Sequence, residues 1–77
     1  MAEVPANISI ELDVRDLDPP EPLQQALAAL PLLKPGEQLR MLHHREPFPL
    51  YAMLRERGFT YRTTQMDDGS YEVLIWR

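Results

Sequence analysis

The sequence predicts an α+β two-layer sandwich, in which a four-stranded mixed sheet carries two helices on one face in the order β-α-β-α-β-β. Three observations lead to this fold class. Apolar residues alternate with polar ones near both ends of the chain, which is typical of strands with one buried face. Between these strands lie two proline-punctuated segments with helical spacing of apolar residues. A chain of 77 residues has room for one core, and two helices can cover one face of such a sheet.

The first strand is predicted from an alternation of apolar with polar residues, at Ile8, Ile10, Leu12 and Val14. Residues 16–22 contain three prolines, which suit a loop that runs into the first turn of a helix. We expect Asp18 to cap this helix, with Glu21 completing an aspartate version of the capping box. Pro31 should end or bend the helix, and residues 34–37 (Lys-Pro-Gly-Glu) should form a turn.

A second strand is predicted over residues 38–44, and its end carries two adjacent histidines, His43 and His44. Pro47 and Pro49 then repeat the loop-into-helix pattern. Apolar residues follow at helical spacing until Gly58, which is typical of a left-handed C-cap. The sequence therefore predicts a short second helix between the two halves of the sheet.

The last two strands are predicted over residues 59–66 and 71–76, joined by a hairpin turn at Asp68-Gly69. Only one sheet face has helices to cover it, so we expect the other face to be wet. If Tyr71, Val73 and Ile75 face the helices, the outward set is Glu72, Leu74 and Trp76. A one-residue shift in register would invert the two sets.

Composition excludes several classes of chemistry. Without cysteine the chain has no disulfide, no thiolate metal site and no nucleophilic thiol. A net charge of −4 disfavours general binding to nucleic acids and anionic membranes. No apolar run approaches the roughly 20 residues of a membrane span. Residues 1–7 lack the features of a signal peptide. We expect a single cytoplasmic domain over residues 1–77, with 1–7 as a flexible N-terminus.

Two segments carry a resemblance to a known family. Residues 12–22 (Leu-Asp-Val-Arg-Asp-Leu-Asp-Pro-Pro-Glu-Pro) resemble the signature of TusA-like, or SirA-like, sulfur carriers, in which Leu-Asp, Arg-Gly-Leu and Cys-Pro-x-Pro elements open the first helix. Residues 34–37 resemble the Pro-Gly-Glu turn of that family. Residues 43–51 resemble uncharacterised bacterial TusA-related domains (domain of unknown function 2249), which occur alone or joined to hemerythrin-like domains. The resemblance implies a TusA-like fold over nearly the whole chain.

The departures from this family limit what the resemblance implies. Pro19 stands where the sulfur carrier has its cysteine, and Asp16 replaces the glycine of the Arg-Gly-Leu element. A sulfur carrier needs a thiolate at the helix N-terminus, where the helix dipole lowers the thiol pKa. Persulfide transfer by this chain alone is therefore excluded, whereas docking to the same type of partner is not.

If the first two strands are parallel, both of their exits into helices lie at one edge of the sheet, where α/β folds usually bind ligands. Asp13 and ten further residues from the two loops and helix starts would gather there. We expect the ten residues other than Asp13 to form a ligand-binding or partner-binding site. They are Arg15, Asp16, Asp18, Glu21, His43, His44, Arg45, Glu46, Phe48 and Tyr51.

Several chemistries remain open at this edge. His43, His44 and Glu46 are weak candidates for metal ligands, because consecutive strand residues point to opposite faces. Anion binding at the two helix starts would use Arg15 and Arg45, but the prolines there remove backbone donors. We predict no metal, no other cofactor and no catalytic residue, since short loops seldom enclose a pocket that excludes water.

The sequence thus favours a non-enzymatic protein-interaction or regulatory module. The resemblance implies a role in redox, nitrogen-oxide or sulfur metabolism. The alternative is a small-ligand or metal-binding domain that uses the same two loops. We expect a protein partner, no nucleic acid and no membrane, with the oligomeric state left open.

Overall fold

A computed structural model describes residues 8–77, and the expected flexible N-terminus lies outside this range. The order of elements agrees with the prediction, with one short 3-10 helix added after the first α-helix. Within residues 8–77 no helix has the length and apolar character that crossing a membrane requires. The elements are β1 (Ile8–Asp13), α1 (Glu21–Ala29), η1 (Leu30–Leu32), β2 (Gln38–His43), α2 (Phe48–Glu56), β3 (Thr60–Gln65) and β4 (Tyr71–Trp76).

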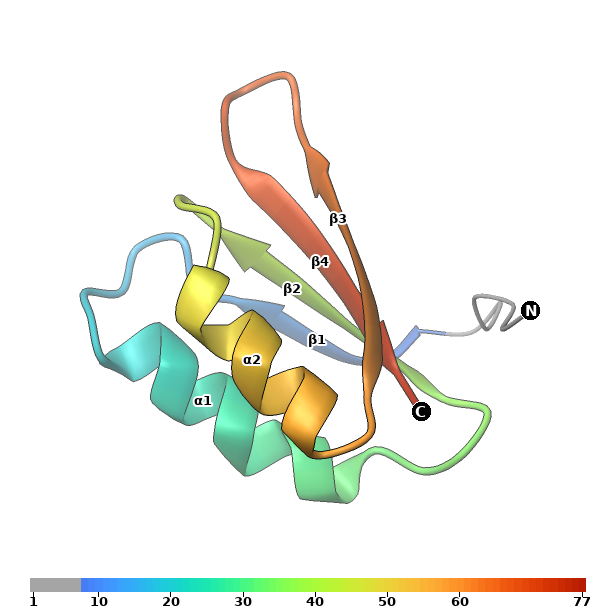
Figure 1. The fold of residues 1–77 in the computed structure, drawn as a ribbon. Coiled ribbons are helices and arrows are strands. Elements are labelled where there is room, and N and C mark those ends of the chain that lie inside the picture. Colours follow the sequence, from blue (N-terminus) through green and yellow to red (C-terminus); the bar gives the residue numbers. More distant parts are fainter. Residues whose placement is uncertain (1–7) are drawn as a thin grey trace.

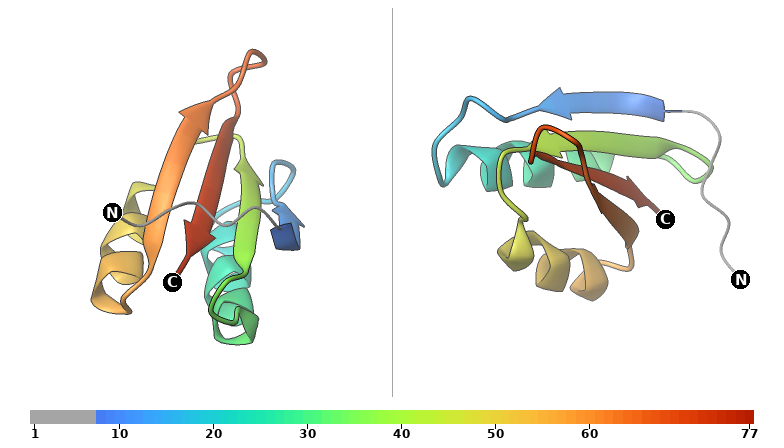
Figure 2. Two further views of the ribbon diagram at one scale, coloured as in Figure 1. Left: turned by 90° about the vertical axis from the view of Figure 1, so that its right-hand side faces the viewer. Right: turned by 90° about the horizontal axis from the view of Figure 1, so that it is seen from above.

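The four strands form one mixed sheet in the order β1-β2-β4-β3 (Figure 1). β1 and β2 are parallel, whereas β4 runs antiparallel to both β2 and β3. Both helices lie on the same side of the sheet (Figure 2). The predicted two-layer sandwich is confirmed, and the parallel pair brings the ends of β1 and β2 to one edge of the sheet.

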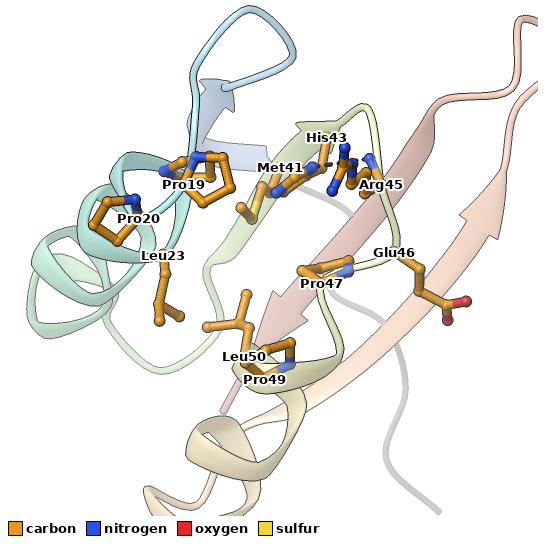
Figure 3. A pocket seen from close by; sticks show the side chains of 11 residues that line it. Pro19, Pro20, Leu23, Met41, His43, Arg45, Glu46, Pro47, Pro49 and Leu50 are labelled. Carbon is orange, nitrogen blue, oxygen red and sulfur yellow. Dashed lines mark hydrogen bonds between the residues drawn. The ribbon is translucent and has the colours of Figure 1, made fainter.

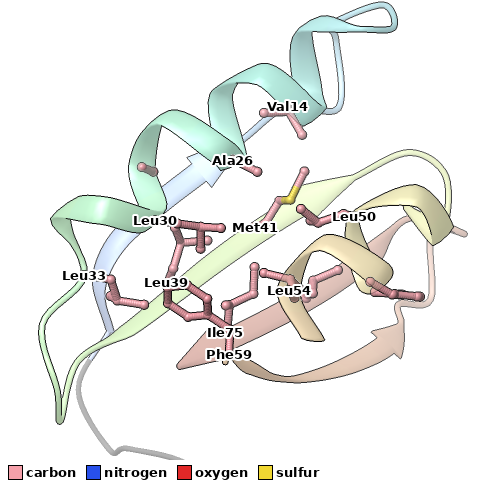
Figure 4. Packing of buried hydrophobic residues seen from close by; sticks show 13 residues of the cluster. Val14, Ala26, Leu30, Leu33, Leu39, Met41, Leu50, Leu54, Phe59 and Ile75 are labelled. Atoms are coloured by element: carbon pink, nitrogen blue, oxygen red, sulfur yellow. The ribbon is translucent and has the colours of Figure 1, made fainter. Parts of the chain in front are cut away.

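The core lies between the sheet and the two helices (Figure 4). β4 contributes Val73 and Ile75, which are fully buried in this cluster, so of the two facings that the sequence left open, these residues face the helices. Apolar residues of α1 and α2 pack against them at helical spacing, because an amphipathic helix places such residues on one stripe. The fully buried side chains with the largest volumes are Leu30, Leu39, Met41, Leu50, Leu54, Ile75, Val14 and Val73.

The opposite sheet face is only partly wet. Arg40 donates hydrogen bonds to Glu72 at 2.5 Å and to Glu11 at 3.2 Å across three neighbouring strands. Leu74 and Trp76, however, expose only 8% and 4% of their surface, so the expectation of a wholly wet face is wrong. In register, Leu74 lies between the long side chains of Arg40 and Arg62, whose aliphatic stems shield apolar neighbours.

The capping box predicted for α1 is wrong. The helix begins at Glu21, its N-cap is Pro20, and no side chain caps it. Asp18 contributes its backbone carbonyl, which accepts the Glu21 N–H at 3.0 Å. The reason is local: two prolines follow Asp18 and offer no N–H, and the first available N–H is already bonded to this carbonyl.

The other predicted turns are confirmed. α1 ends at Ala29, two residues before Pro31. In the turn after η1, the Glu37 N–H donates to the Lys34 carbonyl at 3.0 Å. Gly58 follows α2 with a φ of +81°, and the Phe59 N–H closes the helix end on the Leu54 carbonyl at 2.9 Å.

Candidate functional site

A pocket of about 330 Å³ opens at the edge of the sheet where β1 and β2 end (Figure 3). The loop before α1 and the loop before α2 form its two walls, so it lies where the parallel strands predicted a site. Its lining is mainly apolar and includes five prolines. The lining residues are Pro19, Pro20, Pro22, Leu23, Met41, His43, Arg45, Glu46, Pro47, Pro49 and Leu50.

The prolines determine which polar groups the pocket offers. Proline has no backbone N–H, and the nearby N–H groups of Glu21, Phe48 and Leu50 donate to the carbonyls of Asp18, Glu46 and Pro47, respectively. The helix starts therefore present few backbone donors to an anion. Polar recognition in this pocket depends on side chains.

His43 supplies one of these side chains. The residue is 8% exposed, and Nδ1 of its ring accepts the backbone N–H of Arg45 at 3.0 Å. Burial lowers the pKa of His43, and the neighbouring His44 and Arg45 lower it further. The neutral imidazole carries its proton on Nε2, because Nδ1 is an acceptor. His43 therefore offers an Nε2–H donor at the pocket.

Arg45 and Glu46 both line the pocket but differ in what they offer. Arg45 is exposed, and none of the ion pairs among residues 8–77 involves it. The Glu46 carboxylate points away from the pocket in Figure 3 and accepts a hydrogen bond from the Tyr51 hydroxyl at 3.1 Å. The pocket thus has a cation at its wall, while the nearest carboxylate is directed elsewhere.

Tyr51 anchors α2 to β3 rather than lining the pocket. Its ring is buried and stacks on Tyr61 with centroids 4.4 Å apart. Burial raises the pKa of the Tyr51 hydroxyl to about 12, and hydrogen bonding to Glu46 also raises it. The Tyr51 hydroxyl donates its hydrogen bond to Glu46. It therefore accepts the 2.6 Å hydrogen bond from the Thr63 hydroxyl.

Phe48, at the start of α2, is an exposed aromatic side chain outside the pocket lining. It is 66% exposed, although the edge of its ring meets Tyr51 at 5.8 Å between centroids. Pro47 and Pro49 flank Phe48 and line the pocket. Exposed aromatic rings are common anchors at protein interfaces.

The charged residues of the first loop lie outside the pocket lining. Arg15 donates to the Asp13 carboxylate at 2.7 and 2.9 Å and approaches Asp68 of the β3–β4 turn at 3.7 Å. Its hydrogen bond lowers the pKa of Asp13 to about 2. Asp16, Asp18 and Glu21 are exposed. The structure therefore brings the histidine loop to the pocket but not the acids of the other loop.

The predicted metal candidates do not converge. His43 and His44 have ring centroids 5.0 Å apart, but Nδ1 of His43 already accepts the Arg45 N–H. Glu46 is directed to Tyr51. Among residues 8–77, no group of three histidine or acidic side chains has the arrangement of a metal site.

Sequence reasoning missed the apolar walls of the pocket. The prolines of the lining were recognised in the sequence as signals for helix starts. That they line one pocket depends on how the two loops face each other in space. Leu23, Met41 and Leu50 look like ordinary core residues in the sequence. The useful signal was the repetition of a proline cluster after both parallel strands.

The turn after β1 contains Asp16 at the position where the sulfur carriers have glycine. No described residue other than glycine has a positive φ, so Asp16 adopts an ordinary backbone conformation. The Leu17 N–H donates to the Val14 carbonyl at 3.2 Å and closes the turn. The aspartate is thus accommodated without the left-handed geometry that favours glycine.

Comparisons with known proteins agree with this fold. Residues 11–77 match the family model described as "Uncharacterized conserved protein (DUF2249)". The crystal structure of the SirA-like protein from Desulfitobacterium hafniense is similar, with 25% sequence identity and a TM-score of 0.75. That match covers 86% of this chain and 93% of the other. No curated protein matches the chain.

Proposed function

Because this chain belongs to the DUF2249 family of uncharacterised conserved proteins and has a SirA-like fold without cysteine, we propose that it is a non-enzymatic protein-interaction or regulatory module. The link to redox, nitrogen-oxide or sulfur metabolism is part of this proposal and rests on the family resemblance. Persulfide transfer by the chain itself is excluded, since Pro19 has no thiol.

The observation that carries the proposal is the proline-lined pocket with Arg45 in its wall, together with the exposed Phe48 at the start of α2. Interfaces gain most of their affinity from a few aromatic and arginine anchors around a desolvated centre. Prolines add apolar area that is already ordered, so little entropy is lost when a partner binds. These features support docking of a protein segment.

A pull-down from native cell lysate tests the proposal with the double variant Arg45→Glu, Phe48→Ala. The matched control is Arg62→Glu, Leu32→Ala, which changes the same charge and removes an equally exposed apolar side chain, since Leu32 is 68% and Phe48 is 66% exposed. Circular dichroism checks that all proteins are folded. We expect the control to retain the partner and the pocket variant to lose it, whereas equal capture by both would contradict the proposal.

A small-ligand function is the second candidate, and the pocket volume of about 330 Å³ favours it. Ligand pockets span roughly 300–1,000 Å³, so this one fits a ligand of modest size. Spectra of ¹⁵N-labelled protein titrated with small organic anions and with Zn²⁺ separate the two candidates. Saturable shifts at Met41, His43 and Arg45 would support the small-ligand function.

A further inference from the structure

We infer that the pocket recognises the C-terminal residue of a partner protein, with an apolar side chain against the proline wall and the free carboxylate at Arg45 and His43. This inference rests on the proposed function and names the chemistry of the partner. Apolar walls, one cation and one Nε2–H donor within a single small pocket carry it.

The charges of the pocket select an anion. Arg45 lines the wall and belongs to none of the ion pairs among the described residues. The neutral His43 adds an N–H donor, because its Nδ1 already accepts a backbone hydrogen bond. The Glu46 carboxylate would repel an anion but is turned toward Tyr51. A carboxylate is the group that matches this pair of donors.

The surroundings limit that anion to a single charge. The chain has a net charge of −4, and the exposed acids Asp16, Asp18 and Glu21 belong to the loop and helix start that form the other wall. Polyanions such as nucleic acids are repelled by this charge distribution. One arginine beside an apolar wall suits one carboxylate with an apolar neighbour.

The shape of the pocket favours a chain end over an internal acidic residue. A volume of about 330 Å³ is at the lower end of ligand pockets and suits one residue rather than a long segment. An aspartate or glutamate side chain would present its charge but leave the exposed prolines of the lining, Pro19, Pro20 and Pro49, uncovered. A C-terminal leucine or phenylalanine supplies a carboxylate and an apolar side chain from the same Cα atom.

The test uses ¹⁵N-labelled protein and an acetylated glycine–serine peptide that ends in leucine. The peptide is compared as the free acid and as the C-terminal amide, which has the same side chain without the charge. We expect the acid to shift the signals of Leu23, Met41, His43 and Arg45 and to bind at least about tenfold more tightly than the amide, because hydrogen bonds to a charged group are worth roughly 1.5–3 kcal/mol.

Arg45→Gln should remove the preference for the acid while the amide binds as before, and Arg62→Gln, on the other sheet face, should leave the preference intact. Equal affinity for acid and amide would overturn the inference. N-acetyl-leucine should bind about as tightly as the peptide acid, because it carries the whole residue that fills the pocket. If no peptide binds although lysate capture depends on Arg45 and Phe48, this inference fails and the proposed function stands.

Discussion

His43 links the pocket to the stability of the fold. Its Nδ1 accepts the Arg45 N–H, and this bond holds the first turn of the loop after β2. Protonation of Nδ1 would remove the acceptor and place a charge in a buried ring beside His44 and Arg45. The neutral form of His43 is therefore a condition of the geometry that lines the pocket.

Acidification should destabilise the protein through His43. Its folded pKa lies below the unfolded value of about 6.5, so its contribution to stability is complete above that pH and is lost as pH falls. Urea unfolding at pH 7.5 and 5.5 measures the change. We expect His43→Gln to weaken this pH dependence and His44→Gln, at an exposed residue, to keep most of it, because burial is the larger cause of the lowered His43 pKa. This assignment would be contradicted if the free energy of unfolding of the His43 variant changed between the two pH values as much as that of wild type.

Core residues should show large effects, because a chain this short has few of them. Leu54 is fully buried between α2 and the sheet, whereas Leu32 is 68% exposed. Leu54→Ala should lower the free energy of unfolding by roughly 2–5 kcal/mol, since it removes methyl groups and leaves a cavity. Leu32→Ala should change it by less than about 0.5 kcal/mol. Urea denaturation of both variants provides the comparison.

At the scale of elements, proline and glycine define where the helices begin and end. The positions of the helices were predictable because Pro31 and Gly58 mark their ends and prolines mark their starts. The capping-box pattern wrongly predicted a side-chain cap at Asp18, because that pattern ignores the two prolines that follow. Local sequence signals therefore located elements better than they identified hydrogen bonds.

Gly58 provides a test at this scale. Its φ of +81° is left-handed, and a methyl group added there would meet no atom within 4 Å. Gly58→Ala should therefore cost about 1–2 kcal/mol through backbone strain alone. Glu56→Ala, at an exposed position of α2, should stay within about 0.5 kcal/mol of wild type. Equal stability of wild type and the Gly58 variant would show that the helix end tolerates a side chain.

At the scale of the whole molecule, the sheet edge was predictable and the pocket was not. Parallel pairing of the first two strands follows from the β-α-β order and places both loops together. The pocket depends on which side chains leave space between those loops, and periodicity carries no such information. For the same reason Arg15 pairs with Asp13 and Asp68 instead of joining the histidine loop.

The sheet should unfold cooperatively with the surroundings of Trp76. Trp76, the single tryptophan, is buried in β4, a strand that pairs with both β2 and β3. If the chain unfolds as one domain, Trp76 fluorescence and far-ultraviolet circular dichroism should give the same midpoint in urea. Separate midpoints would show that part of the fold melts independently of the sheet centre.

The central claim is that a protein partner docks at the pocket between the two β-to-α loops. Photo-crosslinking in cells tests it most directly, with a benzophenone amino acid placed at Phe48 or, as a control of similar exposure, at Leu32. The account predicts a discrete crosslinked partner from position 48 that Arg45→Glu abolishes, and none from position 32. Crosslinks from position 32 alone, or a product at position 48 that is insensitive to Arg45→Glu, would contradict it.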